Sequence, residues 1–167
     1  MGKLEGKVAW ITGAGSGIGE ATAHAIAKEG AIVALTGRRK EPLDTVAHAI
    51  EKAGGKALVE PGDVMDKAMA PAVVARIIKA AGRLDVLVNN AGMSPRVPSH
   101  EMTEDLFDKV MDLNFKGPFR LASLIAKRMF DGDGGVMINV SSSGALYPLP
   151  QVVPYSGAKS ALNAMTV

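Results

Sequence analysis

The chain has 167 residues, of which 47% are hydrophobic and 22% charged, so it can bury the core of a single domain spanning residues 1–167. Its 19 basic and 17 acidic residues leave a formal charge of +2 without long runs, which predicts no nucleic-acid and no membrane partner. The absence of cysteine excludes disulfides, thiolate metal sites and thiol catalysis. Without an apolar leader or an apolar stretch of membrane-spanning length, we expect a cytoplasmic protein.

The elements expected along the chain alternate between strands and helices. Short apolar runs that end at glycine or polar residues predict strands, and apolar residues at helical spacing predict the helices between them. The expected strands are 7–12, 31–36, 56–60, 84–88 and 135–140, and the expected helices are 17–30, 41–53, 65–81, 103–130 and one beginning near Pro154. This alternation predicts an α/β fold in three layers, a doubly wound parallel sheet of the Rossmann type.

A glycine-rich turn follows the first expected strand and opens the first helix. Glycine lets the backbone turn tightly and approach a pyrophosphate without a Cβ atom in the way. The helix N-terminus adds free N–H groups and the positive end of its dipole. An ordinary strand-to-helix turn is the alternative, but the strand–turn–helix context favours nucleotide binding by Gly13, Gly15, Ser16, Gly17, Ile18 and Gly19.

The segment after the second expected strand bears on the choice of dinucleotide. Folds that bind NAD usually place a carboxylate there for the ribose, whereas this chain has Arg38, Arg39 and Lys40 before its first acid, Glu41. Guanidinium groups suit the 2′-phosphate of NADP because they form charge-assisted hydrogen bonds. We therefore expect Arg38 and Arg39 to bind NADP, with NAD as the alternative cofactor. The competing interpretation is that Arg39 and Lys40 simply begin a solvated helix.

Tyr155 and Lys159 are four residues apart in the last expected helix, which places both side chains on one face. A fixed positive charge near a phenol favours its ionised form, so the pair forms a group that can donate and accept a proton. Carbonyl reduction and alcohol oxidation require such a group. Taken alone, the pair is better explained as part of a solvated helix face.

Several further motifs complete a recognisable set. They are Thr12-Gly13-(x)3-Gly17-(x)-Gly19, Asp63-Val64, Asn89-Asn90-Ala91-Gly92, Asn114, Ser141-Ser142-Ser143 and Tyr155-(x)3-Lys159, and they span nearly the whole chain. In this order they resemble the short-chain dehydrogenase/reductase family. The resemblance implies an oxidoreductase that transfers a hydride between NADP(H) and a carbonyl or secondary alcohol.

The resemblance also implies roles for individual residues. Tyr155 is expected to be the general acid/base, and Lys159 to assist it and hold the nicotinamide ribose. Ser142, chosen over Ser141 for its thirteen-residue spacing to Tyr155, is expected to bind the substrate oxygen. Asn114 is expected to interrupt the long helix and hold a water linked to Lys159. The remaining cofactor-binding residues implied are Asp63 and Val64 at the adenine, and Asn90, Ala91 and Gly92 near the adenosine ribose.

Family members continue well beyond the helix that carries Tyr155, so the resemblance implies a chain truncated after its fifth strand and the start of the following helix, with an exposed strand edge. We expect a small-molecule carbonyl or alcohol substrate, no metal site, and a homo-oligomer, dimer or tetramer, for a full-length form. The competing hypothesis is a non-catalytic NAD(P)-binding module or an inactive fragment of such an enzyme.

Overall fold

A computed structural model describes residues 2–147 and 149–166 of the chain. Within these residues, five parallel strands form one sheet in the order β3-β2-β1-β4-β5. The strands are β1 (Val8–Thr12), β2 (Ile32–Thr36), β3 (Lys56–Val59), β4 (Val86–Asn89) and β5 (Val136–Asn139). The doubly wound parallel sheet predicted from the alternation of elements is therefore confirmed.

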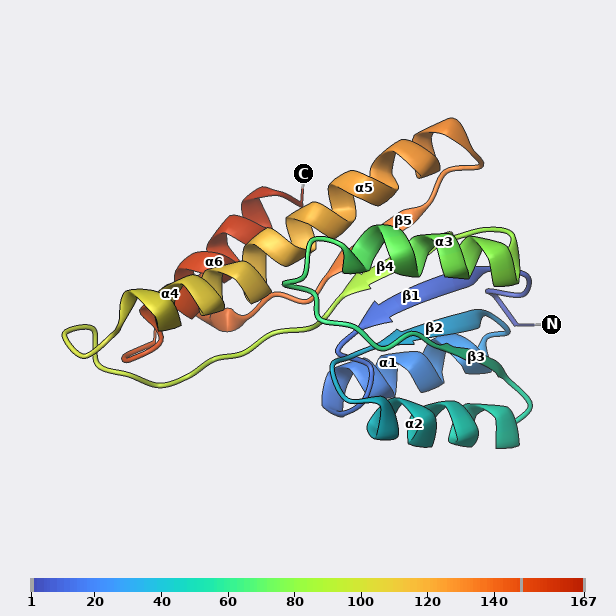
Figure 1. The fold of residues 1–167 in the computed structure, drawn as a ribbon, viewed down its shortest axis with the longest axis horizontal. Coiled ribbons are helices and arrows are strands. Elements are labelled where there is room, and N and C mark those ends of the chain that lie inside the picture. The colour runs from blue at the N-terminus through green and yellow to red at the C-terminus, as the bar shows by residue number, and fades with distance from the viewer. Residues whose placement is uncertain (1, 148, 167) are drawn as a thin grey trace.

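Helices cover both faces of this sheet (Figure 1). One face is covered by α1 (Gly17–Lys28) and α2 (Lys40–Lys52), and the other by α3 (Met69–Ala81) and α5 (Gly117–Asp131). The remaining helices, α4 (Glu104–Met111) and α6 (Val153–Ala164), pack against each other near the end of the molecule toward which the strands point. None of the helices in the described part of the chain is both long and apolar enough to cross a bilayer.

The strands form the floor of two apolar cores. Trp10 and Leu87 point into the core under α3 and α5, whereas Ile11 and Leu35 point into the core under α1 and α2. This alternation is the period-two pattern of a strand, and it leaves β1 buried over its whole length. Each fully buried side chain of this size contributes about 1.5–3 kcal/mol. The central strands are therefore rigid supports for the loops that leave their carboxyl ends.

The predicted long helix over residues 103–130 is not one regular α-helix. After α4, residues Asp112–Lys116 form a π-helical turn, and α5 follows it directly. Thr103 caps the start, because its hydroxyl accepts the Leu106 N–H, as expected. The single α-helix suggested by the apolar pattern is wrong at the π turn, and the interruption at Asn114 implied by the resemblance is present.

The helix expected over residues 65–81 begins only at Met69. The carboxylates of Asp63 and Asp66 accept the N–H groups of Met65 and Ala68, both at 2.9 Å. Such local side-chain bonds offer the backbone an alternative to helix and hold it in turns. The late start keeps Asp63 in the loop that follows β3.

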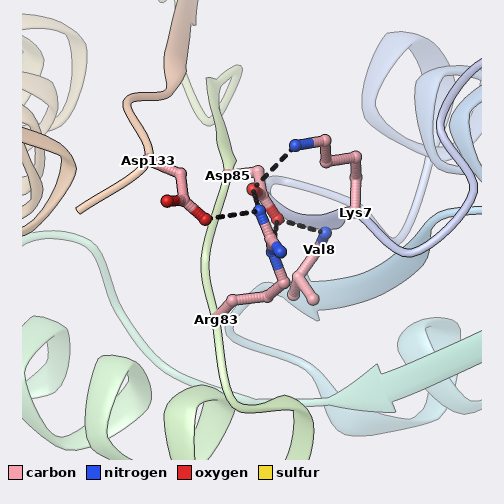
Figure 2. Close-up of polar contacts among 5 residues, drawn as sticks. All are labelled: Lys7, Val8, Arg83, Asp85 and Asp133. Atoms are coloured by element: carbon pink, nitrogen blue, oxygen red, sulfur yellow. Dashed lines mark hydrogen bonds and ion pairs between the residues drawn. The ribbon is translucent and has the colours of Figure 1, made fainter.

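At the opposite end of the sheet, Asp85 joins the beginnings of three strands (Figure 2). Its backbone N–H donates to the Val8 carbonyl, its carbonyl accepts the Val136 N–H, and its carboxylate accepts the Val8 N–H at 2.9 Å. The Arg83 guanidinium donates to the same carboxylate at 2.8 Å and lies 3.7 Å from Asp133. One buried carboxylate thus ties β1 and β4 together where β5 begins.

In the described part of the chain β5 pairs with β4 and forms the edge of the sheet. Val136 and Ile138, which point to one face of the sheet, are 56% and 44% exposed, whereas Met137 packs against the core under α3 and α5. The exposed strand edge expected from the sequence is therefore present.

Candidate active site

A pocket of about 290 Å³ opens at the carboxyl ends of β1, β2 and β4. It lies where ligands bind in open α/β sheets, beyond the carboxyl ends of the strands. Most of the cofactor-binding residues expected from the sequence line it, namely Gly13, Gly15, Ser16, Arg38, Arg39, Asp63, Val64, Asn90, Ala91 and Gly92. The glycine turn and the arginines therefore line one pocket, at the ends of the strands that the apolar runs predicted.

The glycine turn brings the start of α1 against the end of β1. Gly13 and Gly17 have φ angles of +66° and +57°, a region that side chains disfavour. A Cβ atom on Gly19 would lie 2.2 Å from the Gly13 carbonyl oxygen, so only glycine fits there. Ile18 is 64% exposed at this helix start, and Ser16 precedes the first helical residue. Ser16, Gly17 and Ile18 are exposed at the start of α1, where an anion-binding loop offers its N–H groups.

Thr12 and Asn90 lock the turn after β1 to the loop after β4. The Asn90 amide donates to the Thr12 carbonyl at 2.9 Å, and the backbone N–H groups of Asn90 and Ala91 donate to the Thr12 hydroxyl at 3.0 and 3.1 Å. The Thr12 hydroxyl in turn donates to the Val88 carbonyl at 3.2 Å. The Asn90 side chain therefore shapes the pocket by holding the glycine turn in place.

Arg38 and Arg39 lie at the exposed rim of the pocket. Lys40, the next residue, forms an ion pair with Asp44 at 2.7 Å. By contrast, within residues 2–147 and 149–166 neither arginine forms an ion pair. Their positive charges are thus available to an anionic group in the pocket. No cluster of metal-ligating side chains occurs within these same residues.

The pocket also has lining that sequence reasoning missed. Gly37 directly follows β2, and the rule that ligands lie beyond strand ends would have found it. Gly62 precedes Asp63 in the loop after β3. The side chains of Leu43 and Leu113 add apolar lining. Their positions in helical segments look like ordinary core positions in the sequence, so no pattern distinguished them.

Tyr155 and Lys159 lie on one face of α6, as their spacing predicted. The Lys159 nitrogen is 5.8 Å from the centre of the Tyr155 ring and donates to the Val140 carbonyl at 2.7 Å. Lys159 is only 4% exposed, and this burial lowers the pKa of its ammonium group. Val140 also donates its N–H to the Asn89 carbonyl at 2.9 Å. This chain of bonds places the pair beside the loop that lines the pocket.

Ser142 and Ser141 make different hydrogen bonds. The Ser142 oxygen accepts the Gly144 N–H at 3.1 Å and caps the short helical turn Ser143–Ala145. A Cβ atom on Gly144 would lie 3.4 Å from this oxygen and 4.0 Å from the Tyr155 ring, so Gly144 lies close to both side chains. The Ser141 hydroxyl instead donates to the Asn163 side chain at 2.6 Å. The Ser141 hydroxyl proton is therefore already used in a hydrogen bond to α6.

Asn114 is fully buried in the π-helical turn. Its amide donates to the carbonyls of Met93 and Val110, both at 2.9 Å, and its oxygen accepts the Met93 N–H at 3.3 Å. A Cβ atom on Gly92 would lie 2.6 Å from that oxygen. These bonds fix the loop after β4 to the helix. The expected link from Asn114 through water to Lys159 stays a prediction.

Comparison with known proteins gives the same picture. A family model described as short chain dehydrogenase matches residues 7–167. An uncharacterized oxidoreductase of Methylorubrum extorquens is 41% identical over 167 residues, which cover 99% of this chain and 66% of that protein. The chain spans about two thirds of the length of the curated relatives it matches.

Solved structures with different cofactors share the fold. A metagenomic short-chain oxidoreductase in complex with NADP is 36% identical with a TM-score of 0.93, covering 97% of this chain and 74% of its own. An NAD+-bound xylitol dehydrogenase is 30% identical with a TM-score of 0.94, covering 98% of this chain and 64% of its own. Together with the family match and the arrangement of motifs, these similarities show that the chain belongs to the short-chain dehydrogenase/reductase family.

Proposed function

We propose that the chain binds NADP(H) and supplies the proton-transfer residues for hydride transfer between this cofactor and a carbonyl or secondary alcohol. The observation that carries the proposal is the position of Tyr155 and Lys159 on one face of α6, beside the loop that lines the pocket. Membership of a family whose relatives are named oxidoreductases and dehydrogenases supports it.

The residues around the pocket fit a dinucleotide. The close approach at Gly19 and the positive φ angles of Gly13 and Gly17 keep side chains away from the backbone N–H groups at the helix start. Arg38 and Arg39, which have no partner carboxylate among the described residues, suit the 2′-phosphate of NADP. Because one similar structure holds NADP and another holds NAD+, the preference for NADP rests on these two arginines.

When bound, the nicotinamide ring supplies or accepts the hydride. The protein's own contribution is to move a proton at the substrate oxygen. In reduction Tyr155 donates its phenolic proton to that oxygen, and in oxidation it removes the hydroxyl proton. The ammonium of Lys159, 5.8 Å from the ring, stabilises the phenolate that remains.

Ser142 has the hydrogen-bonding state that this chemistry needs. Its oxygen already accepts the Gly144 N–H, so its own proton is free to be donated to the substrate oxygen. A donor placed at an oxygen that gains negative charge contributes about 3 kcal/mol to transition-state stabilisation. Lys159 uses one of its three protons on Val140 and keeps two for other acceptors.

A second function is favoured by a specific feature of the pocket. All of its lining residues lie between Gly13 and Leu113, so the pocket does not depend on α6. A non-catalytic NAD(P)-binding module would use this part alone. A cytoplasmic location and a homo-oligomeric full-length form also remain part of the proposal, as expected from the sequence.

Two measurements test the proposed function. NADPH and NADH fluorescence titrations measure binding, and NADPH oxidation with ethyl acetoacetate, cyclohexanone or benzaldehyde measures turnover. We expect NADPH to bind more tightly than NADH and at least one carbonyl to be reduced. Tyr155→Phe should abolish turnover and leave NADPH affinity unchanged. Binding without turnover of any carbonyl would favour the module, and an active Tyr155→Phe variant would refute the role of the phenol.

A further inference from the structure

A second polar face of α6 lies next to the face that carries Tyr155 and Lys159. It consists of Ser156, Ser160 and Asn163, which are spaced four and three residues apart and so lie along one side of the helix. All three lie against residues 141–145, which we call the serine segment because it contains Ser142. We call these three residues the positioning face.

Two hydrogen bonds hold the ends of the segment. At its start, the Ser141 hydroxyl donates to the Asn163 side-chain oxygen at 2.6 Å. At its end, the Ser160 hydroxyl donates to the Ala145 carbonyl at 2.9 Å. Because the two anchors lie on successive turns of one helix, the segment cannot slide along α6 without breaking both bonds.

The middle of the segment is held by close packing at Gly144. This glycine is buried, and a Cβ atom added to it would lie 3.2 Å from the Ser156 oxygen and 3.4 Å from the Ser142 oxygen. The first of these distances is shorter than an ordinary contact between side chains. Gly144 therefore sets how closely the serine segment approaches the helix that carries Tyr155.

Ser156 has a further property that its neighbours do not explain. It is only 6% exposed, and its hydroxyl has no hydrogen-bond partner among residues 2–147 and 149–166. A buried hydroxyl without a partner contributes no net hydrogen-bond stability. The Ser156 oxygen is the nearest atom that a methyl group at Gly144 would meet, so a smaller side chain at 156 would make room for that group.

We propose that the positioning face, together with Gly144, fixes Ser142 relative to Tyr155, so that both hydroxyl groups meet one substrate oxygen. The proposal rests on the proposed function, because it concerns the geometry of that reaction. Ser156, Ser160 and Asn163 act through the serine segment and do not touch the substrate. A misplacement of about 1 Å at a reacting group costs on the order of 100-fold in rate.

The test adds a methyl group at the contact and then makes room for it. Gly144→Ala should lower kcat on the order of 10- to 100-fold, with NADPH affinity unchanged, because the pocket lies elsewhere. In the double variant with Ser156→Ala, most of the lost kcat should return, since the oxygen facing the new methyl group is gone. Gly157→Ala is the matched control: it is next to Ser156, and a Cβ there meets nothing within 4 Å. It should retain full kcat.

Rescue separates positioning from general damage. The kcat, KM and pH profile are measured with the best carbonyl substrate of the panel, and folding is followed by thermal unfolding. If Gly144→Ala does not fold, Ser160→Ala replaces it, because this variant removes only an exposed hydroxyl and its bond to Ala145. We expect a lower kcat, an unchanged NADPH affinity and an unchanged pH profile.

The outcomes distinguish the inference from the function on which it rests. An unsubstituted chain that reduces no carbonyl overturns the proposed function and the inference with it. An active unsubstituted chain with an equally active Gly144→Ala variant overturns the inference alone. The same holds if Ser156→Ala fails to restore the folded but slow Gly144→Ala variant, or if a folded Ser160→Ala variant, used in its place, keeps full kcat.

Discussion

Lys159 lies 5.8 Å from the centre of the Tyr155 ring, yet its nearest acceptor is the Val140 carbonyl at 2.7 Å. The ammonium is therefore held by the backbone of Val140, which directly precedes the serine segment. Its effect on the Tyr155 phenol is electrostatic. Burial lowers the pKa of Lys159. An ammonium that is kept in a buried place at a cost in stability is typical of a functional group.

The lowered pKa of Lys159 predicts a pH-dependent stability. Between the lowered pKa and the ordinary value of 10.5, the unfolded chain binds a proton that the folded chain has released. Stability therefore rises with pH across this window. Relative to Lys159→Met, the unsubstituted chain should gain free energy of unfolding from neutral pH to just below pH 10.5, measured by urea unfolding.

Lys40→Met, at an exposed ion pair, is the control, and its free energy of unfolding should change with pH as that of the unsubstituted chain does. Parallel curves for Lys159→Met would contradict the prediction.

Removal of the two rim arginines should change the cofactor preference. If the proposed NADP binding holds, replacing Arg38 and Arg39 with alanine removes charge-assisted hydrogen bonds to the 2′-phosphate, each worth about 1.5–3 kcal/mol. The dissociation constant for NADPH should rise at least about tenfold, whereas that for NADH should stay the same. Lys40→Ala is the control, since Lys40 is paired with Asp44 outside the pocket lining. An equal loss for both cofactors would mean that the arginines shape the loop without reading the phosphate.

Two glycines of the turn should respond differently to alanine. At Gly19 a Cβ atom would lie 2.2 Å from a backbone oxygen, so the start of α1 must move and NADPH binding should be lost. At Gly17 a Cβ atom meets nothing within 4 Å, and the cost is the positive φ of +57°. That cost is about 1–2 kcal/mol. Thermal unfolding and NADPH titration of both variants measure the difference, and equal losses would argue against the steric explanation.

Asp85→Ala should destabilise the fold without touching the pocket. Burial alone raises the pKa of Asp85, but the hydrogen bonds from Arg83 and Val8 outweigh it, so the pKa lies below the usual 3.8. A carboxylate with a lowered pKa stabilises the protein above about that pH, and the contribution is lost as the pH falls through the lowered value.

At neutral pH, loss of the Asp85 carboxylate leaves the buried Val8 N–H without a partner and should cost about 1–3 kcal/mol in urea unfolding. Asp133→Ala removes the 85% exposed partner of the same guanidinium (Figure 2) and should change stability by at most about 0.5 kcal/mol. A larger effect at Asp133 than at Asp85 would reverse the proposed importance of the two contacts.

The sequence predicted the sheet and the pocket because both follow from local patterns. Apolar runs identified the strands, and the strand-end rule then placed the glycine turn and the arginines at one edge. Asp63 was expected there only because of the family resemblance. The contacts around the proposed catalytic residues are harder to predict from the sequence. The bond from Ser141 to Asn163 joins residues 22 positions apart, and no pattern in either segment predicts it. The Asp85 cluster was missed because the expected strand 84–88 already contained Asp85, and no pattern indicates that its carboxylate accepts the Val8 N–H.

The π turn shows the limit of periodicity as a guide. Apolar residues continue at nearly helical spacing through residues 103–130, so the pattern indicates one helix. Asn114 lies in this turn, and its side-chain amide hydrogen-bonds the Met93 backbone as well as the Val110 carbonyl. Met93 belongs to another loop, and its position is known only once the chain has folded.

One additional residue in the turn Asp112–Lys116 rotates α5 by about 100° relative to α4. Because of this rotation, the continuous helical segment from α4 to α5 packs against two partners. Its α4 part contacts α6, and its α5 part contacts α3. Deletion of one residue of this turn other than Asn114 would keep every motif residue, yet it should turn Leu121, Ile125 and Met129 away from the sheet. The number of residues between α4 and α5 is therefore as much a determinant of this fold as their identity.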